Sequence, residues 1–340
     1  MVLCLCYNIK MKNIDILAIG DVATDAFIRL EDAEVNCDAD KKNCRLSVKF
    51  GDKVPYESVE ICTAVGNSAN AAVSAVRLGL SSSLLAYVGN DQNGKECITE
   101  LQKNNVMTDY VRTEDGKKTN YHYVLWYDVE RTILVKHEAF SYNLGDITAP
   151  KWLYLSSLGE NTTDYHNQIA DFVEKNPETK LAFQPGTFQI KMGKEVLARI
   201  YKNTEIFFCN VEEAQKILNE SSRDIKILME GLSALGPKKV VVTDGYDGAY
   251  AHDTASPEDF WFIPIYPHTP FERTGAGDAF ASTIVSALAL GKTLEEALMW
   301  ASINSMSVVQ QVGAQKGLLS LEKIEEYLAS APENYRVRKI

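Results

Sequence analysis

We begin from residues 271–280, which read Phe271-Glu272-Arg273-Thr274-Gly275-Ala276-Gly277-Asp278-Ala279-Phe280. Two glycines flank one alanine here, so the backbone can turn tightly and come close to a ligand. Apolar residues then recur at helical spacing, at Phe280, Ile284, Ala287 and Leu288. The pattern predicts a helix that starts at the glycines and carries Asp278 in its first turn.

Asp278 in that turn predicts a site that combines an anion hole with a proton acceptor. Free backbone N–H groups and the helix dipole attract anions to a helix N-terminus. Such a hole stabilises a phosphoryl group in transfer, and a carboxylate beside it can accept the proton of the attacking hydroxyl. For this stretch alone, a loop with a capping acid is an equally good interpretation. The rest of the chain has to decide between them.

The composition bounds the class of protein. The 340 residues are 46% hydrophobic and 24% charged, which is typical of a globular protein with a large core. The formal net charge is −11, and long runs of Lys and Arg are absent. Nucleic acid and anionic membranes are therefore not expected as partners. No apolar run approaches the length of about 18 residues that spans a bilayer. The scattered cysteines favour a cytoplasmic protein.

The cysteines give no motif. There are seven of them, an odd number, and none forms a C-x-x-C pair. Cys37 and Cys44 share one polar loop without a histidine, so a zinc site is not favoured. We expect reduced thiols, as is usual in a cytoplasmic protein. Residues 1–11 are interpreted as an N-terminal extension, with Met11 as an alternative start.

The first half of the chain places polar side chains after a buried strand and at a helix start. Residues 14–19 read as the strand, and Asp25 follows its carboxyl end, where open α/β sheets bind ligands. A helix with an apolar stripe begins after Gly66. Asn67 and Asn70 share one face of its first turn, and their amides suit a polyol. Helix capping is the alternative role for both.

A second, smaller sheet is predicted outside the main body. Residues 119–126 and 131–137 alternate in part and read as a hairpin. Together with strands near residues 26–30 and 45–63, they would form a small antiparallel sheet that covers a site or pairs two subunits. The hairpin carries aromatic side chains that could stack on a sugar or a nucleobase, although we expect dimer packing for most of them: Tyr121, His122, Tyr123, Trp126 and Tyr127.

From residue 152 onward, strands alternate with helical segments, which predicts a parallel sheet. Asn210 and Glu213 follow one strand and suit Mg²⁺ binding through water, although a capped helix is the commoner role of this spacing. Thr243, Gly245 and Gly248 follow another strand and form a turn that a nucleotide could approach. Gly291-Lys292-Thr293 looks like the end of a P-loop. That motif is rejected because Ser286 stands where its first glycine is required. With only five histidines, imidazole chemistry is not expected.

These motifs together resemble the ribokinase-like (PfkB) family of carbohydrate kinases, from about residue 14 to 328. The family's D-T-x-G-A-G-D signature is similar to residues 272–278, and its N-terminal signature is similar to residues 66–79. The resemblance implies a three-layer α/β fold with a mainly parallel sheet flanked by helices, plus a small β-sheet lid. We expect a single domain over residues 12–335, with the lid formed by about 26–63 and 112–138.

The resemblance also implies roles for individual residues. Asp278 would be the general base, and Gly275, Ala276 and Gly277 the anion hole. The acceptor would lie on Asp25, Gly66, Asn67 and Asn70. Asn210 and Glu213 would organise Mg²⁺ and the phosphates of ATP. The nucleotide would be lined by Thr243, Gly245, Gly248, Gly275, Gly277 and Asn304. The lid would build a homodimer, as in ribokinase-like members.

Two departures from the family pattern bear on function. Glu272 and Arg273 replace the Asp-Thr pair that helps to bind a monovalent cation in some members, so potassium dependence is not carried over. Val65-Gly66-Asn67 replaces residues that touch the substrate, so the acceptor is not carried over either. A sugar is the leading acceptor and a nucleoside the alternative. A catalytically silent regulatory protein is the rival class, and the intact Asp278 argues against it.

Overall fold

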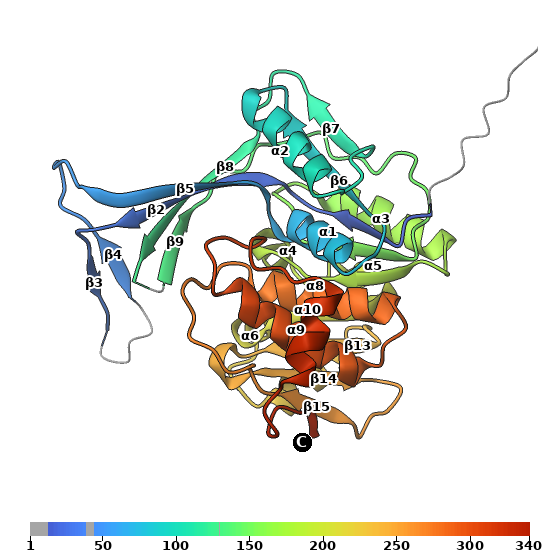
Figure 1. The fold of residues 1–340 in the computed structure, drawn as a ribbon. Coiled ribbons are helices and arrows are strands. Elements are labelled where there is room, and N and C mark those ends of the chain that lie inside the picture. The colour runs from blue at the N-terminus through green and yellow to red at the C-terminus, as the bar shows by residue number, and fades with distance from the viewer. Residues whose placement is uncertain (1–12, 39–43, 129) are drawn as a thin grey trace, which may run out of the picture.

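The computed structural model describes residues 13–38, 44–128 and 130–340. They form a large central sheet between two layers of helices, and a smaller sheet projects from one side (Figure 1). The predicted three-layer α/β fold is therefore confirmed. The helices are α1 (Asn67–Arg77), α2 (Gln92–Lys103), α3 (Thr163–Lys175), α4 (Thr187–Met192), α5 (Ala198–Asn203), α6 (Val211–Leu218), α7 (Ile225–Ser233), α8 (Ala276–Ala289), α9 (Leu294–Val308) and α10 (Leu321–Ala329).

The central sheet has ten strands in the order β16-β15-β14-β13-β12-β11-β10-β1-β6-β7. From β7 to β13 neighbouring strands are parallel, whereas β14, β15 and β16 add an antiparallel edge. The bounds are β1 (Ile16–Ile19), β6 (Ser82–Gly89), β7 (Val111–Glu114), β10 (Trp152–Leu155), β11 (Lys180–Phe183), β12 (Thr204–Asn210), β13 (Lys239–Thr243), β14 (Ala249–Asp253), β15 (Phe260–Ile263) and β16 (Arg338–Lys339).

Alternate side chains of the buried strands pack into two separate hydrophobic cores, one on each face of the sheet. In β1, Ile16 and Ala18 pack with α1, α8 and α9, whereas Leu17 and Ile19 pack with α3, α6 and α7. Strands that are covered on both faces read as continuous apolar runs, which is why they are recognisable in the sequence. Both helical layers are thereby fixed to the sheet, and the helices that follow its strands start at defined positions.

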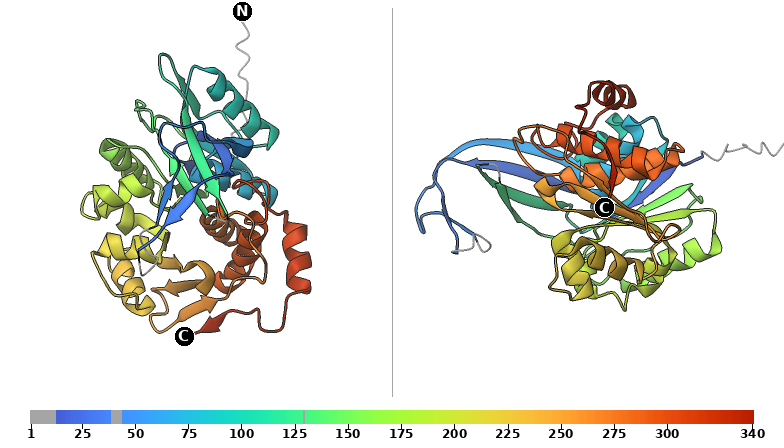
Figure 2. Two further views of the ribbon diagram at one scale, coloured as in Figure 1. Left: turned by 90° about the vertical axis from the view of Figure 1, so that its left-hand side faces the viewer. Right: turned by 90° about the horizontal axis from the view of Figure 1, so that it is seen from below.

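The smaller sheet, which we call the lid sheet, has the strand order β5-β2-β8-β9. Its strands are β2 (Ala23–Leu30), β5 (Tyr56–Val65), β8 (Asn120–Tyr127) and β9 (Glu130–Leu134). The outer pairings are antiparallel and the central pairing of β2 with β8 is parallel. At its far end a separate hairpin is formed by β3 (Glu34–Asn36) and β4 (Arg45–Ser47) (Figure 2).

Several expectations need correction or remain open. Cys37 and Cys44 form a disulfide, because the pairing of β3 with β4 brings them together, so reduced thiols were the wrong prediction there. The N-terminal extension 1–11, with Met11, lies outside the described residues. The boundaries 12–335, 26–63 and 112–138 stay predictions. Across the described residues we find no helix that is long and apolar enough to cross a membrane.

Candidate active site

Helix α8 begins where the sequence predicted, with Gly275 as its N-cap. Gly275 has φ 83°, and a Cβ there would lie 2.4 Å from the Cβ of Ala314, so only glycine fits without strain. The apolar face that follows, including Phe280 and Ile284, is buried in the core. The first turn of α8, from Ala276 to Asp278, is thereby held at the wall of a cavity of about 560 Å³. We call this space the large cavity.

The carboxylate of Asp278 is surrounded by side-chain amides. Asn67 donates to Oδ1 and Asn70 to Oδ2, both at 2.8 Å, and Gln184 donates to Oδ1 at 3.1 Å. The orientation of Asn70 is fixed in turn, because its Oδ1 accepts from Gln315 at 2.9 Å. The predicted Asn67 and Asn70 thus meet the predicted Asp278 across more than 200 residues of sequence.

Burial and hydrogen bonding act in opposite directions on the pKa of Asp278. Burial raises it above the usual value, since a charged carboxylate is poorly solvated there. The amides of Asn70, Gln184 and Asn67 and the nearby guanidinium of Arg131 oppose this, but the net direction is upward. A raised pKa suits a group that has to take up a proton near neutral pH.

The helix that carries the two asparagines begins at Gly66, which also lines the large cavity. Gly66 has φ 116°, and a Cβ there would lie 2.6 Å from the carbonyl oxygen of Asp21. The glycine is therefore needed for the close approach of two chain segments. The N-cap of α1 is Gly66, which has no side chain that could cap the helix, and neither asparagine takes this position. Capping therefore does not account for Asn67 and Asn70.

Asn210 and Glu213 form a reciprocal cap at the start of α6. The side chain of Asn210 accepts from the Glu213 backbone at 2.8 Å, and Oε2 of Glu213 accepts from the Asn210 backbone at 2.9 Å. Both residues also line the large cavity, and burial raises the pKa of Glu213. Within the described residues, no group of three or more His, Cys, Asp or Glu side chains could enclose a metal ion. The structure therefore supports capping and leaves the metal role a prediction.

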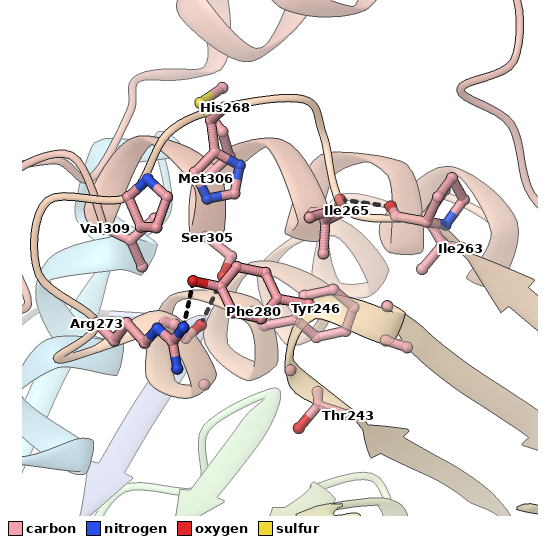
Figure 3. A pocket seen from close by; sticks show the side chains of 18 residues that line it. Thr243, Tyr246, Ile263, Ile265, His268, Arg273, Phe280, Ser305, Met306 and Val309 are labelled. Carbon is pink, nitrogen blue, oxygen red and sulfur yellow. Dashed lines mark hydrogen bonds between the residues drawn. The ribbon is translucent and has the colours of Figure 1, made fainter. Parts of the chain in front are cut away.

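A second cavity, of about 170 Å³, adjoins the first and is mostly apolar; we call it the small cavity (Figure 3). It lies beside the turn that follows β13, and the predicted Thr243, Gly245 and Gly248 line it. Ile263, Ile265, Phe280, Met306 and Val309 supply its apolar walls. The apolar lining of this space suits a nucleobase better than a polyol.

Asn304 does not line either of the two cavities, and its expected place near the nucleotide stays a prediction. Its side chain is fully buried, donating to Thr283 at 2.7 Å and accepting from the Leu319 backbone at 2.8 Å. The reason is its position on α9, where Ser302, Ser305 and Met306 turn toward the cavity instead. In the core, Asn304 thus connects helix α8 to the segment around Leu319 by two hydrogen bonds.

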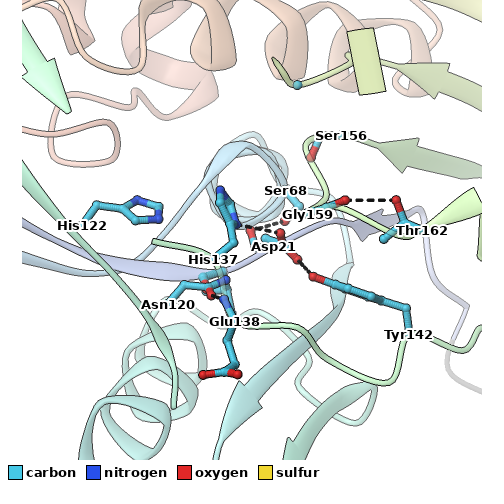
Figure 4. Close-up of polar contacts among 12 residues, drawn as sticks. Asp21, Ser68, Asn120, His122, His137, Glu138, Tyr142, Ser156, Gly159 and Thr162 are labelled. Atoms are coloured by element: carbon cyan, nitrogen blue, oxygen red, sulfur yellow. Dashed lines mark hydrogen bonds and ion pairs between the residues drawn. The ribbon is translucent and has the colours of Figure 1, made fainter. Parts of the chain in front are cut away.

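Two aspartate–histidine pairs line the large cavity, and Figure 4 shows the pair of Asp21 and His137. Oδ1 of the predicted Asp25 lies 3.1 Å from Nδ1 of His122. Asp21, which is 7% exposed, lies 3.2 Å from Nδ1 of His137 and accepts from the hydroxyl of Tyr142 at 2.7 Å. Burial and the Asp21 carboxylate raise the pKa of Tyr142, so this hydroxyl stays a donor. Imidazole side chains thus line the large cavity, and the expectation about imidazole chemistry stays a prediction.

The lid aromatics divide between the two faces of the lid sheet. His122 faces the large cavity, whereas Tyr121, Tyr123 and Tyr127 alternate to the opposite face. Trp126 is 4% exposed and packs edge-on against Phe271 at the base of the lid. Of the five aromatic residues singled out in the sequence, His122 alone lines either the large or the small cavity.

Sequence reasoning missed several residues of the site. Gln184 follows the carboxyl end of β11, and the rule that ligands bind at strand ends could have identified it. His122 and Arg131 lie on lid strands, where only knowledge of the register tells which face a side chain takes. Arg273 was noticed as a departure from a motif, without a role. It lines both cavities.

Comparison with known proteins agrees with this geometry. The model of the pfkB family of carbohydrate kinases matches residues 33–321. Ribokinase from Bacillus subtilis is 26% identical over 278 residues, covering 78% of this chain and 87% of that protein. A bifunctional protein HldE from Sulfurimonas denitrificans is 25% identical over 93% of this chain, which spans 64% of that longer protein.

Among solved structures, Arabidopsis thaliana ribokinase complexed with ribose and ATP superposes with a TM-score of 0.76 at 20% identity. The match covers 93% of this chain and 99% of that one, which shows a shared fold. The family model covers most of the chain, and it agrees with the motifs and with the arrangement of the cavities. This protein therefore belongs to the pfkB family of carbohydrate kinases, which are phosphotransferases that act on an alcohol group.

Proposed function

We propose that this protein transfers the γ-phosphoryl group of ATP to a hydroxyl of a sugar, with Asp278 as general base. The observation that carries the proposal is the position of Asp278. Its carboxylate lies in the first turn of α8, at the wall of a polar cavity that adjoins an apolar one. The acceptor would occupy the large cavity and the nucleotide the small one, so that their reactive groups meet at the start of α8.

In this mechanism, each residue acts on a stated atom. Asp278 accepts the proton of the acceptor hydroxyl. At the same time the oxygen of that hydroxyl attacks the γ-phosphorus, and ADP leaves. The backbone N–H groups of Gly275, Ala276 and Gly277 stabilise the charge on the transferred group. Asp25, with His122 beside it, and the amides of Asn67 and Asn70 would hold the other hydroxyls of the acceptor. The amides now bound to Asp278 are thereby within reach of a ligand next to it.

Mg²⁺ is expected to accompany ATP, and the donor set around α6 is compatible with it. Mg²⁺ is commonly bound by one or two carboxylates, several waters and the substrate phosphates. Glu213, which uses one carboxylate oxygen in the helix cap, would supply the carboxylate, with Asn210 beside it. When bound, the ion would neutralise phosphate charge.

A monovalent cation is not part of the proposal. Glu272 replaces the family aspartate, and its carboxylate accepts from the backbone and the hydroxyl of Thr274 at 2.8 and 2.6 Å. The guanidinium of Arg131 lies 3.7 Å away and already neutralises this buried charge. We therefore expect equal rates in potassium and choline salts. A rate that rises tenfold in potassium alone would contradict this.

A sugar is favoured over a nucleoside because the aromatic side chains of the lid mostly face away from the large cavity. The rings that the lid sheet offers to a nucleobase in this cavity are those of His122 and the buried Phe27. For a phosphosugar, the cations at this cavity are Arg131 and Arg273, which already pair with Glu272 and Glu130. Arg29 and Lys191 are outside the lining, Arg29 being paired with Glu57 at 2.8 Å.

The opposite face of the lid sheet supports the expected homodimer. Register places Ile61, Ala26, Tyr123 and Leu134 in one row across the four strands, on the face turned away from the cavity. Ile61, Tyr123 and Leu134 are 59%, 49% and 52% exposed. An apolar row of this size is costly to leave in water, so we propose that a second copy packs on it. Sedimentation should give a dimer, and a monomer would contradict this.

The test is ADP release from ATP and Mg²⁺ with a panel of sugars, phosphosugars and nucleosides. We expect one free sugar to stimulate ADP release, and the Asp278→Asn variant to lose that stimulation. Stimulation by a nucleoside alone would assign the large cavity to ribose and base instead. ATP binding without phosphorylation of any acceptor would favour a regulatory protein and contradict the proposal.

The location in the cell remains part of the same proposal. A kinase that uses ATP and Mg²⁺ is expected in the cytoplasm, where both are available. The Cys37–Cys44 disulfide is the feature that a reducing compartment does not favour. Labelling of thiols in freshly lysed cells would show whether the disulfide is present in the cell, and fractionation would test the location directly.

A further inference from the structure

The two cavities meet at a short segment of wall. The residues that line both are Thr243, Arg273, Ala276, Gly277 and Phe280. If the nucleotide base lies in the small cavity and the acceptor in the large one, the polyphosphate has to cross this wall. Of the shared residues, Arg273 alone carries a charge. It precedes Gly275 by two positions, so its side chain starts next to the proposed anion hole.

The surroundings of this crossing are acidic. Asp25, Glu213 and Asp278 line the large cavity, and the whole chain has a formal net charge of −11. Among the lysines and arginines of the described chain, Arg131 and Arg273 are those that line the two cavities. A polyphosphate that enters here needs positive charge at close range, since like charges repel strongly where water is excluded.

Arg131 is already committed to another carboxylate. It lies 3.7 Å from Glu272, whose side chain has no exposed surface. Drawing the guanidinium away would leave a buried carboxylate without its neighbouring positive charge, which is strongly unfavourable. Arg131 therefore cannot turn to a phosphate without a large cost, and it stays the partner of Glu272.

Arg273 is held much more loosely. Its guanidinium lies 4.3 Å from the centre of the Tyr246 ring and donates to the Tyr246 hydroxyl, as Figure 3 shows. Its charged partner is Glu130 of the lid strand β9, at 2.5 Å. The two side chains are 34% and 60% exposed, and such exposed ion pairs contribute little stability because water screens them.

We propose that Arg273 binds the polyphosphate of the donor nucleotide, exchanging Glu130 of the lid for phosphate oxygens when the nucleotide enters. This inference rests on the proposed function. The planar guanidinium can keep its stacking on Tyr246 while its N–H groups turn from a carboxylate to a phosphate, since both accept two parallel hydrogen bonds. Glu130 is then a competitor of the nucleotide for one arginine, and the lid strand loses a contact upon binding.

Calorimetric titration with ATP, ADP, AMP and adenosine tests this without any knowledge of the acceptor. Arg273→Met should weaken ATP binding by about ten- to a hundredfold, as expected for the loss of charged hydrogen bonds. The loss should shrink as phosphates are removed and vanish for adenosine. Arg273→Lys, a point charge without the fork, should fall between. Arg29→Met is the matched control, because Arg29 lies on the lid but outside both cavity linings.

Glu130→Gln distinguishes two roles of Arg273. One is phosphate binding, and the other is an ion pair with Glu130 that only joins the lid sheet to the body. If Glu130 competes with phosphate, its removal should tighten ATP binding by a few-fold, opposite in sign to Arg273→Met. Weakening by both variants would mean that the ion pair itself is needed, and would overturn the inference. Equal weakening of ATP and adenosine by Arg273→Met, or no weakening, would overturn it too. A wild-type protein that binds none of the four ligands would instead contradict the proposed function.

Discussion

The central sheet and the lid sheet supply opposite walls of the large cavity, but they position side chains in different ways. On the side of the central sheet, Asn67, Glu213 and Asp278 all lie in the first turn of a helix. Their places are set by where each helix starts. On the lid, His122 lies in the middle of β8, and its direction is set by alternation along the strand.

This difference indicates which part of the site is robust. A helix start is fixed locally, by a glycine or a cap and by the apolar face that follows. A lid side chain depends on register, and a shift by one residue would turn it to the opposite face. The chemistry should therefore depend on the helix starts, and the choice of acceptor on the lid. The predictions below test this division.

Asp278→Asn, on the side of the central sheet, is expected to have the largest effect on catalysis. The variant keeps the shape of the side chain but has no carboxylate to accept the proton. General-base catalysis contributes about 10²–10⁴-fold, so kcat should fall by that factor. KM for the acceptor should change much less. Steady-state ADP release at saturating acceptor measures this, and a kcat within threefold of wild type would break the division.

A pair of glycine variants distinguishes the start of α8 from its contact with ligand. Gly275→Ala should lower the free energy of unfolding by about 1–3 kcal/mol, because alanine is strained at φ 83° and its Cβ would overlap Ala314. Gly277→Ala should fold normally, since its Cβ would meet no atom within 4 Å, yet weaken catalysis by crowding the anion hole. Urea denaturation and kcat report the two effects. Equal loss of stability in both variants would contradict the assignment.

The pH dependence of kcat/KM should follow the protonation of the buried carboxylate of Asp278. Burial raises the pKa of Asp278 above the ordinary value of an aspartate, so the base becomes protonated, and inactive, at a higher pH than an exposed aspartate. On the acid side kcat/KM should fall about tenfold per pH unit below that raised pKa. Gln184→Leu removes a donor to the carboxylate and should move this acid limb further upward. A limb that Gln184→Leu leaves in place would argue against Asp278 as the titrating group.

The smallest effect is expected from the lid, from two neighbouring residues on opposite faces. His122→Phe removes a polar contact next to Asp25 and should raise KM for the acceptor about three- to tenfold, with a smaller change in kcat. Tyr123→Phe, on the outer face, should leave both constants within about twofold. The acceptor KM of the two variants provides the comparison. A larger effect at Tyr123 would mean that the register differs from the one described.

The sequence was informative where function and local structure coincide. Gly275, Asp278, Asn67 and Glu213 could be predicted because each follows a recognisable strand and opens a recognisable helix. The parallel half of the central sheet was predictable for the same reason, since its buried strands are continuous apolar runs. The antiparallel edge formed by β14, β15 and β16 was not, because these strands are short and partly exposed.

Long-range pairings limited the rest. Whether His122 or Tyr123 faces the cavity depends on the pairing of β8 with β2, which lies almost a hundred residues away. Asn304 looked available in the sequence, but its amide is used up by Thr283 and Leu319 in the core. Arg273 stood beside the motif from the start, yet only the meeting of two cavities gives it a role.

We expect Asp278 to act on an acceptor hydroxyl that binds equally well when the carboxylate of Asp278 is replaced. A single-turnover experiment with excess enzyme and ATP labelled in its γ-phosphoryl group tests this most directly, once the acceptor is known. Wild type should move the label to the acceptor in one fast phase. Asp278→Asn should bind both ligands with similar affinity and transfer the label at least a hundredfold more slowly. Transfer at the wild-type rate would contradict the account.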